Sequence, residues 1–408
     1  MAVELASAQC CIAGGGPAGV MTGLLLARAG VDVLVLEKHA DFFRDFRGDT
    51  LHPSTLELMY ELGLDRELLR LPHQKVRELA FHVGARAFKV ADFSHLPVRH
   101  PFIALMPQWD FLNFLAETGA RYPTFRLRKN AEVTALVEHE GRITGLRANT
   151  REGDLEVHAD LVLGTDGRHS TVREKAGLVV DEIGAPIDVL WFRLSRPPGD
   201  PEATMARLGA GHFMVMLNRG DYWQCGFVIA KGDGEKIKAR GLFAFRRDVA
   251  ELAPFLGARV EELRDWDAIK LLTVAIDRLR QWHRPGLLCI GDAAHAMSPV
   301  GGVGINLAIQ DAVAAANILA APLREGRAEP AQLAAVQARR EWPARITQAV
   351  QVEVQKRILA PILGSRGEPQ PPLLVRLLDR VPLLRRIPAY LVGIGVRPEH
   401  VRTAEVAK

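Results

Sequence analysis

Three short segments combine glycines and acids in a way that could hold a polar ligand. The first is GGGPAG, where Gly14, Gly16 and Gly19 follow the apolar run QCCIA. Glycines at this spacing permit a tight turn, a close approach of the backbone to a pyrophosphate, and close packing of a helix on a strand. Pro17 and Ala18 belong to this turn, and the N-terminus of the helix predicted for VMTGLLLARAG offers N–H groups to phosphate.

The strand after this helix, VDVLVLE, ends at Glu37, and Lys38 follows it. Glu37 lies 18 residues beyond Gly19, where an acid can bind the ribose hydroxyls of an adenosine. The glycines, the two flanking strands and this acid together predict a dinucleotide-binding βαβ unit over residues 9 to 37.

The second segment is GTDGRHSTVR, in which Asp166 and Gly167 end the apolar strand ADLVLG. Asp166 could hold polar atoms of a cofactor. It could equally cap the helix predicted for STVREKAG, and the residues alone leave these alternatives open.

The third segment is GDAAHAMSPVGGVGINLAIQDA, residues 291 to 312, after the apolar run LLCIG. Asp292 could accept hydrogen bonds from hydroxyls of a cofactor chain. The following glycines leave backbone N–H groups open, and a helix starting near Ile305 would direct its positive end at a developing anion. A sugar-alcohol chain beside an anionic ring would use all these features.

Composition indicates the class of protein. The 408 residues suggest two domains, and a net charge of +4 without charge blocks gives no sign of nucleic-acid binding. The four cysteines lie in apolar runs without metal-ligand spacing, so we expect buried thiols and no metal. We expect a cytoplasmic protein without a membrane span.

The order of predicted elements indicates an α/β, Rossmann-like domain interrupted by a β-sheet-rich domain, with a helical C-terminal tail. Helices are predicted over 53–62 and 109–121, and antiparallel strands over 181–284 with a helix near 241–253. We assign residues 1–75, 101–180 and 285–345 to the first domain, 76–100 and 181–284 to the second, and 346–408 to the tail.

Together, in this order and spacing, the three segments resemble those of the FAD-dependent aromatic hydroxylases, the p-hydroxybenzoate hydroxylase-like class A flavoprotein monooxygenases. The resemblance covers roughly residues 9 to 345. It implies an FAD cofactor, NADPH or NADH as transient reductant, and molecular oxygen as co-substrate. The implied reaction hydroxylates an aromatic, polyketide-like or quinone-precursor substrate through a flavin C4a-hydroperoxide.

The resemblance also assigns roles to residues. It places Gly14, Gly16 and Gly19 at the pyrophosphate, Glu37 at the ribose, and Asp292, with Gly291, at the ribityl chain. Further predicted cofactor contacts are Pro17, Ala18, Lys38, Arg47, Gln108, Asp166, Pro299, Gly302, Val303, Gly304, Ile305 and Asn306. Pro299 would also line the substrate side.

The substrate side is less determined by the sequence. Candidates on the β-rich insert are Arg193, Met214, Trp223 and Gln224, with His212 and Tyr222 as candidate catalytic residues. Packing in the sheet is the commoner role for such aromatic residues, and His212 is more typical of a surface or turn histidine. We expect His295 to be structural.

Three alternatives compete with the monooxygenase, and two of them remain open at this point. A reductase or dehydrogenase of the same fold would not oxygenate its substrate, and a non-catalytic flavoprotein would only protect a reactive intermediate. A halogenase would need the motif WxWxIP, which does not occur.

The tail LLVRLLDRVPLLRRIPAYLVGIGV could lie on a membrane surface, but Pro382 and Pro388 favour packing over the substrate entrance. We expect a monomer or homodimer.

Overall fold

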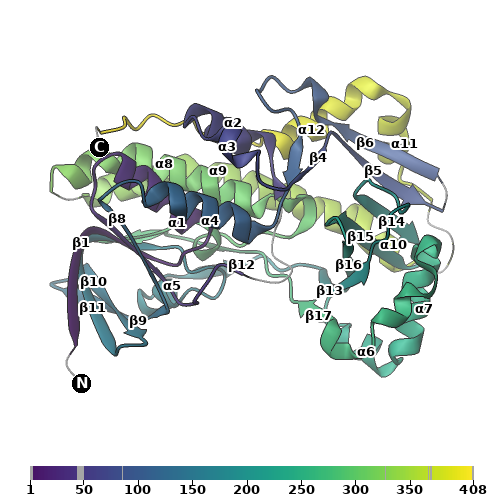
Figure 1. Ribbon diagram of the computed structural model, residues 1–408, viewed down its shortest axis with the longest axis horizontal. Coiled ribbons are helices and arrows are strands. Elements are labelled where there is room, and N and C mark those ends of the chain that lie inside the picture. Colours follow the sequence, from purple (N-terminus) through teal and green to yellow (C-terminus); the bar gives the residue numbers. More distant parts are fainter. Residues whose placement is uncertain are drawn as a thin grey trace.

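The computed structural model describes residues 3–43, 50–84, 86–326, 328–365, 367 and 370–406. Its largest sheet joins the N-terminal βαβ unit to strands from much later in the chain (Figure 1). The order across the sheet is β19 (His283–Arg284), β20 (Leu287–Cys289), β11 (Asp154–Gly164), β1 (Glu4–Ala13), β2 (Val33–Glu37) and β8 (Phe125–Lys129). The strands from β20 to β8 are parallel.

Strands β9 (Ala131–His139) and β10 (Arg142–Thr150) extend this sheet from β11 as an antiparallel meander. Every residue of β2 is buried, as expected for a parallel strand covered on both faces. Because β20 follows the β-rich insert and pairs with β11, the prediction that distant segments rejoin one sheet is confirmed.

Long helices cover this sheet and pack on one another (Figure 1). They are α1 (Pro17–Arg28), α4 (Gln108–Gly119), α8 (Gly304–Arg324) and α9 (Pro330–Val354). Among the described helices, only the stretch 300–324 is long and apolar enough to cross a membrane. In its most apolar part 78% is buried inside the protein, which is typical of a core helix. The boundary predicted at 345 falls inside α9.

Shorter elements surround these layers. The small sheets are β3 (Thr50–Leu51), β7 (Ile103–Leu105) and β4 (Gln74–Val76), and β12 (Val180–Glu182) with β18 (Asp277–Leu279). The short helices are α2 (Pro53–Glu61), α3 (Asp65–Leu68), η1 (Phe93–His95), α5 (Thr171–Lys175), η4 (Gly291–Ala293) and η5 (Val300–Gly302). The helices predicted over 53–62 and 109–121 are therefore present.

A second sheet forms the β-rich layer. Its order is β17 (Lys270–Leu272), β13 (Ile187–Ser195), β16 (Tyr222–Ala230), β15 (His212–Asn218), β14 (Met205–Gly209), β5 (Glu78–Val83) and β6 (Arg86–Asp92). All neighbours are antiparallel except β14 and β5, which run parallel.

The two faces of this second sheet contact different partners. One face packs against α7 (Leu242–Leu252) and η2 (Pro254–Glu262), with α6 (Gly234–Ala239) and η3 (Trp266–Ala268) beside them. The other face packs against η6 (Gln355–Leu359) and α10 (Ala360–Leu363). Val300, from the third glycine-rich segment, packs against the apolar cluster on this face. Side chains alternate between these faces along each strand.

The C-terminal tail crosses both layers. Helices α11 (Leu373–Arg380), η7 (Pro382–Arg385) and α12 (Arg386–Gly393) lie beside β6, and residues 395–406 then return to the first domain. There the Arg28 guanidinium donates to the carbonyl of Thr403 at 2.7 Å. Pro382 does end the preceding helix, whereas Pro388 lies inside α12, in its first turn, where the missing N–H has no intrahelical role.

Candidate functional site

The three glycine- and acid-bearing segments converge at one edge of the parallel sheet. Ala13 at the end of β1 pairs with Gly164 at the end of β11, and Gly164 pairs with Cys289 at the end of β20. Ala13 also pairs with Leu36, one residue before Glu37. Parallel strands bind ligands in the crevice outside their carboxyl ends, so the register assembles the predicted residues where such a site is expected.

The first turn is held by the segment that carries the second motif. Gly14 has φ of 108°, and a Cβ there would lie 2.6 Å from the carbonyl oxygen of Thr165. The Thr165 hydroxyl lies 2.9 Å and 2.8 Å from the carbonyl oxygens of Ala13 and Gly14. A Cβ placed on Gly16 would lie 4.0 Å from the nearest protein atom, the carbonyl oxygen of Thr165, so the backbone there is open to a ligand.

Glu37 is almost fully buried beside this turn. Its carboxylate accepts the backbone N–H of Gly15 at 3.0 Å and that of His39 at 3.0 Å, which fixes its orientation. Lys38 is exposed. Arg47, predicted at the phosphate side, lies outside the described residues.

Asp166 contacts the helix that follows it. Its carboxylate accepts the Ser170 hydroxyl at 2.5 Å and the Val172 N–H at 3.0 Å, while the Ser170 hydroxyl oxygen caps α5 by accepting the Arg173 N–H. Burial raises the pKa of Asp166, and these hydrogen bonds offset part of that effect. The helix-start role is therefore present in the structure, and a cofactor contact stays a prediction.

The GD turn lies against both long helices. A Cβ on Gly291 would lie 3.1 Å from the Cβ of Ala18 in α1 and 3.4 Å from that of Ala308 in α8. The neighbouring Asp292 is half-buried, and within the described ranges no group donates a hydrogen bond to its carboxylate or pairs with it. An acid held near the carboxyl ends of the strands without a protein partner is suited to ligand hydroxyls.

A buried charge cluster supports the GD turn from behind, and the sequence prediction did not find it. Asp311 of α8 accepts the Gly291 N–H at 3.0 Å, lies 2.6 Å from His295 Nε2, and accepts Arg340 Nε at 2.9 Å. Arg340 also pairs with Glu399 of the tail at 3.3 Å. Burial acts to raise the pKa of Asp311, but His295 and Arg340 outweigh it, and the net shift is downward.

Two features could have indicated this cluster. Asp311 is the only charged residue between Gly304 and Leu323, in a helix that is otherwise apolar or uncharged. Fully buried acids are rare unless they are paired, so a partner was to be expected. The expectation that His295 is structural agrees with its burial in this cluster.

The glycine-rich loop between Pro299 and Gly304 is fastened by Asn306 and Thr50. Asn306 Nδ2 donates to the carbonyls of Thr50 and Gly302, and its Oδ1 accepts from the His52 N–H and the Thr55 hydroxyl. The Asn306 side chain is thus used within the protein, and a cofactor contact there would need its backbone. Val303, Gly304 and Ile305 form the start of α8, and Gln108 is half-buried at the start of α4.

Two predicted substrate contacts lie on the α7 side of the second sheet. Trp223 is fully buried in the cluster between the second sheet and α7, where its indole N–H donates to Asp200 Oδ2 at 2.8 Å. Met214 is fully buried in the same cluster. Alternation along β15 and β16 directs both side chains away from the face that carries Val300, so they cannot line a site there.

The opposite face carries other candidates. Trp191 belongs to the cluster that includes Val300, and its ring lies over Gly226 of the neighbouring strand. By alternation Arg193, Tyr222 and Gln224 share this face. Arg193 is exposed, with its guanidinium 4.9 Å from the ring centroid of Tyr222, and Gln224 is buried. Trp191 was not predicted, because aromatic residues on both faces look alike in the sequence.

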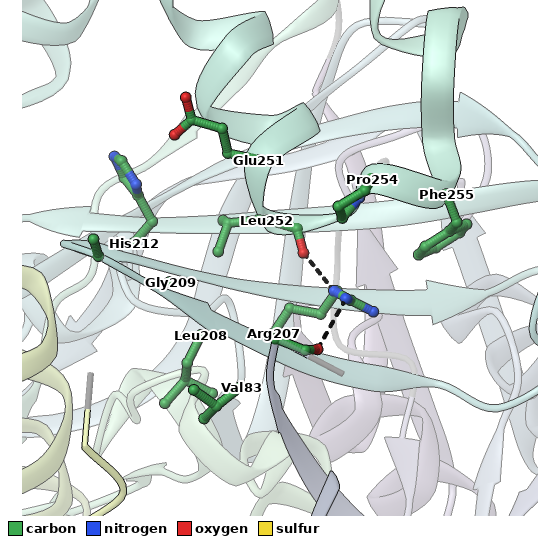
Figure 2. A pocket seen from close by; sticks show the side chains of 11 residues that line it. Val83, Arg207, Leu208, Gly209, His212, Glu251, Leu252, Pro254 and Phe255 are labelled. Atoms are coloured by element: carbon green, nitrogen blue, oxygen red, sulfur yellow. Dashed lines mark hydrogen bonds between the residues drawn. The ribbon is translucent and has the colours of Figure 1, made fainter. Parts of the chain in front are cut away.

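His212 lies on the α7 side, in a cavity of about 590 Å³ (Figure 2). Its Nε2 is 3.5 Å from Asp248 Oδ2. In the same cavity Arg207 donates to the carbonyls of Leu252 and Gly84. Because His212 shares the face of Met214 and Met216, opposite to the face that carries Val300, the placement does not support His212 as a base near the glycine-rich loop.

Comparison with known proteins identifies the family to which the chain belongs. The family model described as FAD binding domain matches residues 7–351. The chain is 32% identical over 379 residues to 6-methylpretetramide 4-monooxygenase of Streptomyces rimosus, covering 92% of this chain and 90% of that protein. The chain belongs to the p-hydroxybenzoate hydroxylase-like family of FAD-dependent aromatic monooxygenases.

Two further comparisons bear on this monooxygenase. The crystal structure of p-nitrophenol 4-monooxygenase from Pseudomonas putida superposes with a TM-score of 0.77 at 21% identity, covering 98% of this chain and all of that one, which shows the shared fold. Dialkyldecalin synthase of Streptomyces rugosporus is 28% identical over 332 residues, covering 79% of this chain and 67% of that protein.

The residues present fit the FAD of this family. The open backbone at Gly16, the unpaired carboxylate of Asp292 and the start of α8 lie at one end of the parallel sheet. They match a pyrophosphate, a polyhydroxyl chain and a ring that becomes anionic on reduction.

Proposed function

We propose that this monooxygenase uses NADPH or NADH to hydroxylate an extended aromatic, polyketide-like substrate. The observation that carries the proposal is the contact between the glycine-rich loop and the second sheet. Val300 of that loop belongs to the same apolar cluster as Trp191 and Val215. A substrate held on this face would lie next to the loop that faces the flavin.

The first domain binds and orients the cofactor. Backbone N–H groups after Gly16 and the N-terminus of α1 bind the pyrophosphate, and Glu37 holds the ribose. Asp292 accepts hydrogen bonds from the ribityl hydroxyls. When bound, FAD accepts electrons from the nicotinamide and passes them to oxygen.

The chain also stabilises charge on the flavin ring and shields the reacting atoms from water. The N-terminus of α8 stabilises negative charge on the ring beside it. The apolar face of the second sheet excludes water from the reacting atoms and positions the aromatic substrate. The clustered side chains on this face are mostly aliphatic or aromatic, which fits an aromatic ligand rather than a charged one.

The proposal rests on the 6-methylpretetramide relative for its substrate class, because that protein is matched over nearly its whole length. Experiment can distinguish the proposed monooxygenase from a reductase and from a non-catalytic flavoprotein that protects a reactive intermediate. The synthase relative shows why the distinction matters, since its name describes no oxygenation.

The test is product analysis with labelled oxygen. Purified holoenzyme would be screened against polycyclic aromatic polyketides with NADPH and with NADH, in an atmosphere of ¹⁸O₂. We expect one compound to accelerate nicotinamide oxidation and to yield a product with one labelled oxygen atom.

Two results would contradict the proposal. Conversion of a substrate without label would show a reductase, dehydrogenase or synthase activity. Nicotinamide oxidation that yields only hydrogen peroxide for every polycyclic aromatic compound, but labelled product for a small phenol, would overturn the substrate class alone.

A further inference from the structure

The C-terminal tail presents a large apolar surface that no described residue covers. Its exposed members lie on α11, η7 and α12 and at the junction between α11 and η7: Leu373, Leu374, Leu377, Val381, Leu383, Ile387, Tyr390 and Leu391. Leu373 is 82% exposed and Leu383 65% exposed. We call these eight residues the leucine surface. Contiguous exposed apolar residues on this scale are uncommon on a protein that has no partner there.

The leucine surface stands on a packed base. Val375 of α11 is buried, and α11 lies beside β6. Ala389 of α12 and Ile394 belong to a cluster with Ala91 and Phe93 of the β6–η1 segment. In Figure 1 these yellow helices lie on the outer side of β5 and β6. The inner side of each helix is therefore already used in the fold, and the exposed side is left for another contact.

The charges around the leucine surface are mainly positive. Residues 373–391 contain four arginines and one acid, Asp379. Asp379 accepts the Lys89 N–H at 3.0 Å and lies 3.6 Å from the guanidinium of Arg86, so its charge is compensated. Arg380 and Arg386 are exposed, and neither contacts an acid among the residues that the structure describes.

We propose that the leucine surface docks on a lipid bilayer that contains anionic headgroups. An apolar helix face flanked by arginines is suited to this interface, because the side chains enter the acyl boundary while the guanidinium groups contact lipid phosphate. Each arginine near an anionic surface adds electrostatic attraction.

Charge argues against a second copy of the chain as the occupant. A two-fold contact would set the leucine surface against itself, and it would bring Arg380 and Arg386 against the same residues of the partner. Like charges across an interface are destabilising, and no described acid on this surface remains to compensate them.

The experiment is vesicle co-sedimentation of the full-length holoenzyme. The probes are phosphatidylcholine vesicles with and without phosphatidylglycerol, at low and high salt. We expect binding to the anionic vesicles that weakens with salt and is much weaker for phosphatidylcholine alone. This comparison needs no variant.

Variants assign the binding to the leucine surface. Leu373→Ser/Leu374→Ser/Leu383→Ser should lower vesicle partitioning by more than about tenfold. Arg380→Gln/Arg386→Gln should lower it by about fivefold for each arginine. The matched control is Phe243→Ser/Arg151→Gln, which removes an apolar residue that is 76% exposed and an exposed arginine elsewhere. FAD content should be unchanged in all variants.

Three outcomes would overturn the proposal. Wild-type protein could remain in the supernatant with anionic vesicles, or the leucine variant could sediment as the wild type does. In the third, the wild type is a dimer without vesicle binding and the leucine variant is a monomer, which would show that a second copy covers the surface.

Discussion

A carboxylate oxygen of Asp311 accepts the backbone N–H of Gly291 at 3.0 Å, across 20 residues of sequence. This contact fixes the turn that carries Asp292, the acid proposed to hold the ribityl chain. The two acids thus differ in their surroundings: Asp311 is fully buried and paired within the protein, whereas Asp292 is half-buried and accepts no hydrogen bond from any group that the structure describes.

Substitutions at these two acids should separate the roles. Asp292→Asn should raise the dissociation constant for FAD by about tenfold to a hundredfold, since hydrogen bonds to a charged group contribute about 1.5–3 kcal/mol. The free energy of unfolding of the apoprotein should change by no more than about 0.5 kcal/mol. Flavin titration by fluorescence and chemical denaturation of the apoprotein measure the two quantities.

The control for this pair is Asp311→Ala. It leaves Arg340 and the Gly291 N–H without their partner in the core, and it should cost about 3–5 kcal/mol of apoprotein stability. If Asp292→Asn keeps the wild-type affinity for FAD, the placement of the ribityl chain at Asp292 is wrong.

The first glycine turn allows a similar contrast. Gly16→Val should give a folded protein that purifies with little FAD, because a branched side chain fits the protein but occupies the position of the pyrophosphate. Gly19→Ala should instead destabilise the fold by about 1–3 kcal/mol or more, since its Cβ would lie 1.9 Å from the Gly14 carbonyl oxygen. Circular dichroism reports folding, and the flavin-to-protein absorbance ratio reports cofactor content. A yellow Gly16→Val protein would contradict this prediction.

His52 predicts a pH dependence of stability. Burial lowers the pKa of His52 to about 4, and its Nδ1 lies 2.6 Å from the carbonyl oxygen of Val392 in α12. In the unfolded chain His52 takes up a proton below about pH 6.5, whereas in the folded protein it does so only near pH 4. This contribution to stability is therefore complete above about pH 6.5 and is lost as the pH falls from there toward 4.

The shift sets an upper limit of roughly 3 kcal/mol for this loss. His52→Gln cannot titrate, so its unfolding free energy should depend less on pH between 6.5 and 4 than that of the wild type. The exposed His139 gives the matched control, His139→Gln, which should keep the wild-type profile. Equal slopes for the wild type and His52→Gln would show that His52 is not the responsible group.

The βαβ unit of the first domain could be predicted from the sequence because its signals are local. A glycine turn between two apolar runs defines a βαβ unit, and the acids at strand ends indicate the edge of the sheet where a ligand is expected. The cluster of Asp311, His295 and Arg340 is different in kind. Its members come from separate elements, and only the crossing of α8 and α9 brings them together.

The second sheet shows another limit of prediction from the sequence. The alternation of side chains along a strand predicts that Trp223 and Gln224 point to opposite faces of the sheet, but it does not predict which face meets the first domain. That depends on where α7 and the tail pack, and both are distant in sequence from β16. The prediction therefore placed Met214 and Trp223 on the substrate side and omitted Trp191.

The proposed substrate face gives the last prediction. Trp191→Ala should retain FAD and lose little stability, because the indole is only partly buried. It should raise the KM for the aromatic substrate about tenfold, as expected when a ring contact worth about 1.4 kcal/mol is lost. It should also increase the share of nicotinamide oxidation that ends in peroxide. Trp223→Ala is the matched control, and removal of its fully buried indole should cost about 3–5 kcal/mol of stability.

Thermal denaturation, steady-state kinetics and peroxide assay with the compound that stimulates nicotinamide oxidation separate the two tryptophans. The physical reason is their position on opposite faces of one sheet. Trp191 shares an apolar cluster with Val300 of the glycine-rich loop, whereas Trp223 packs against Phe255 of η2 with ring centroids 6.0 Å apart. If Trp223→Ala raised KM in a stable protein while Trp191→Ala left it unchanged, the substrate would lie on the α7 face and the proposed site would be on the wrong side of the sheet.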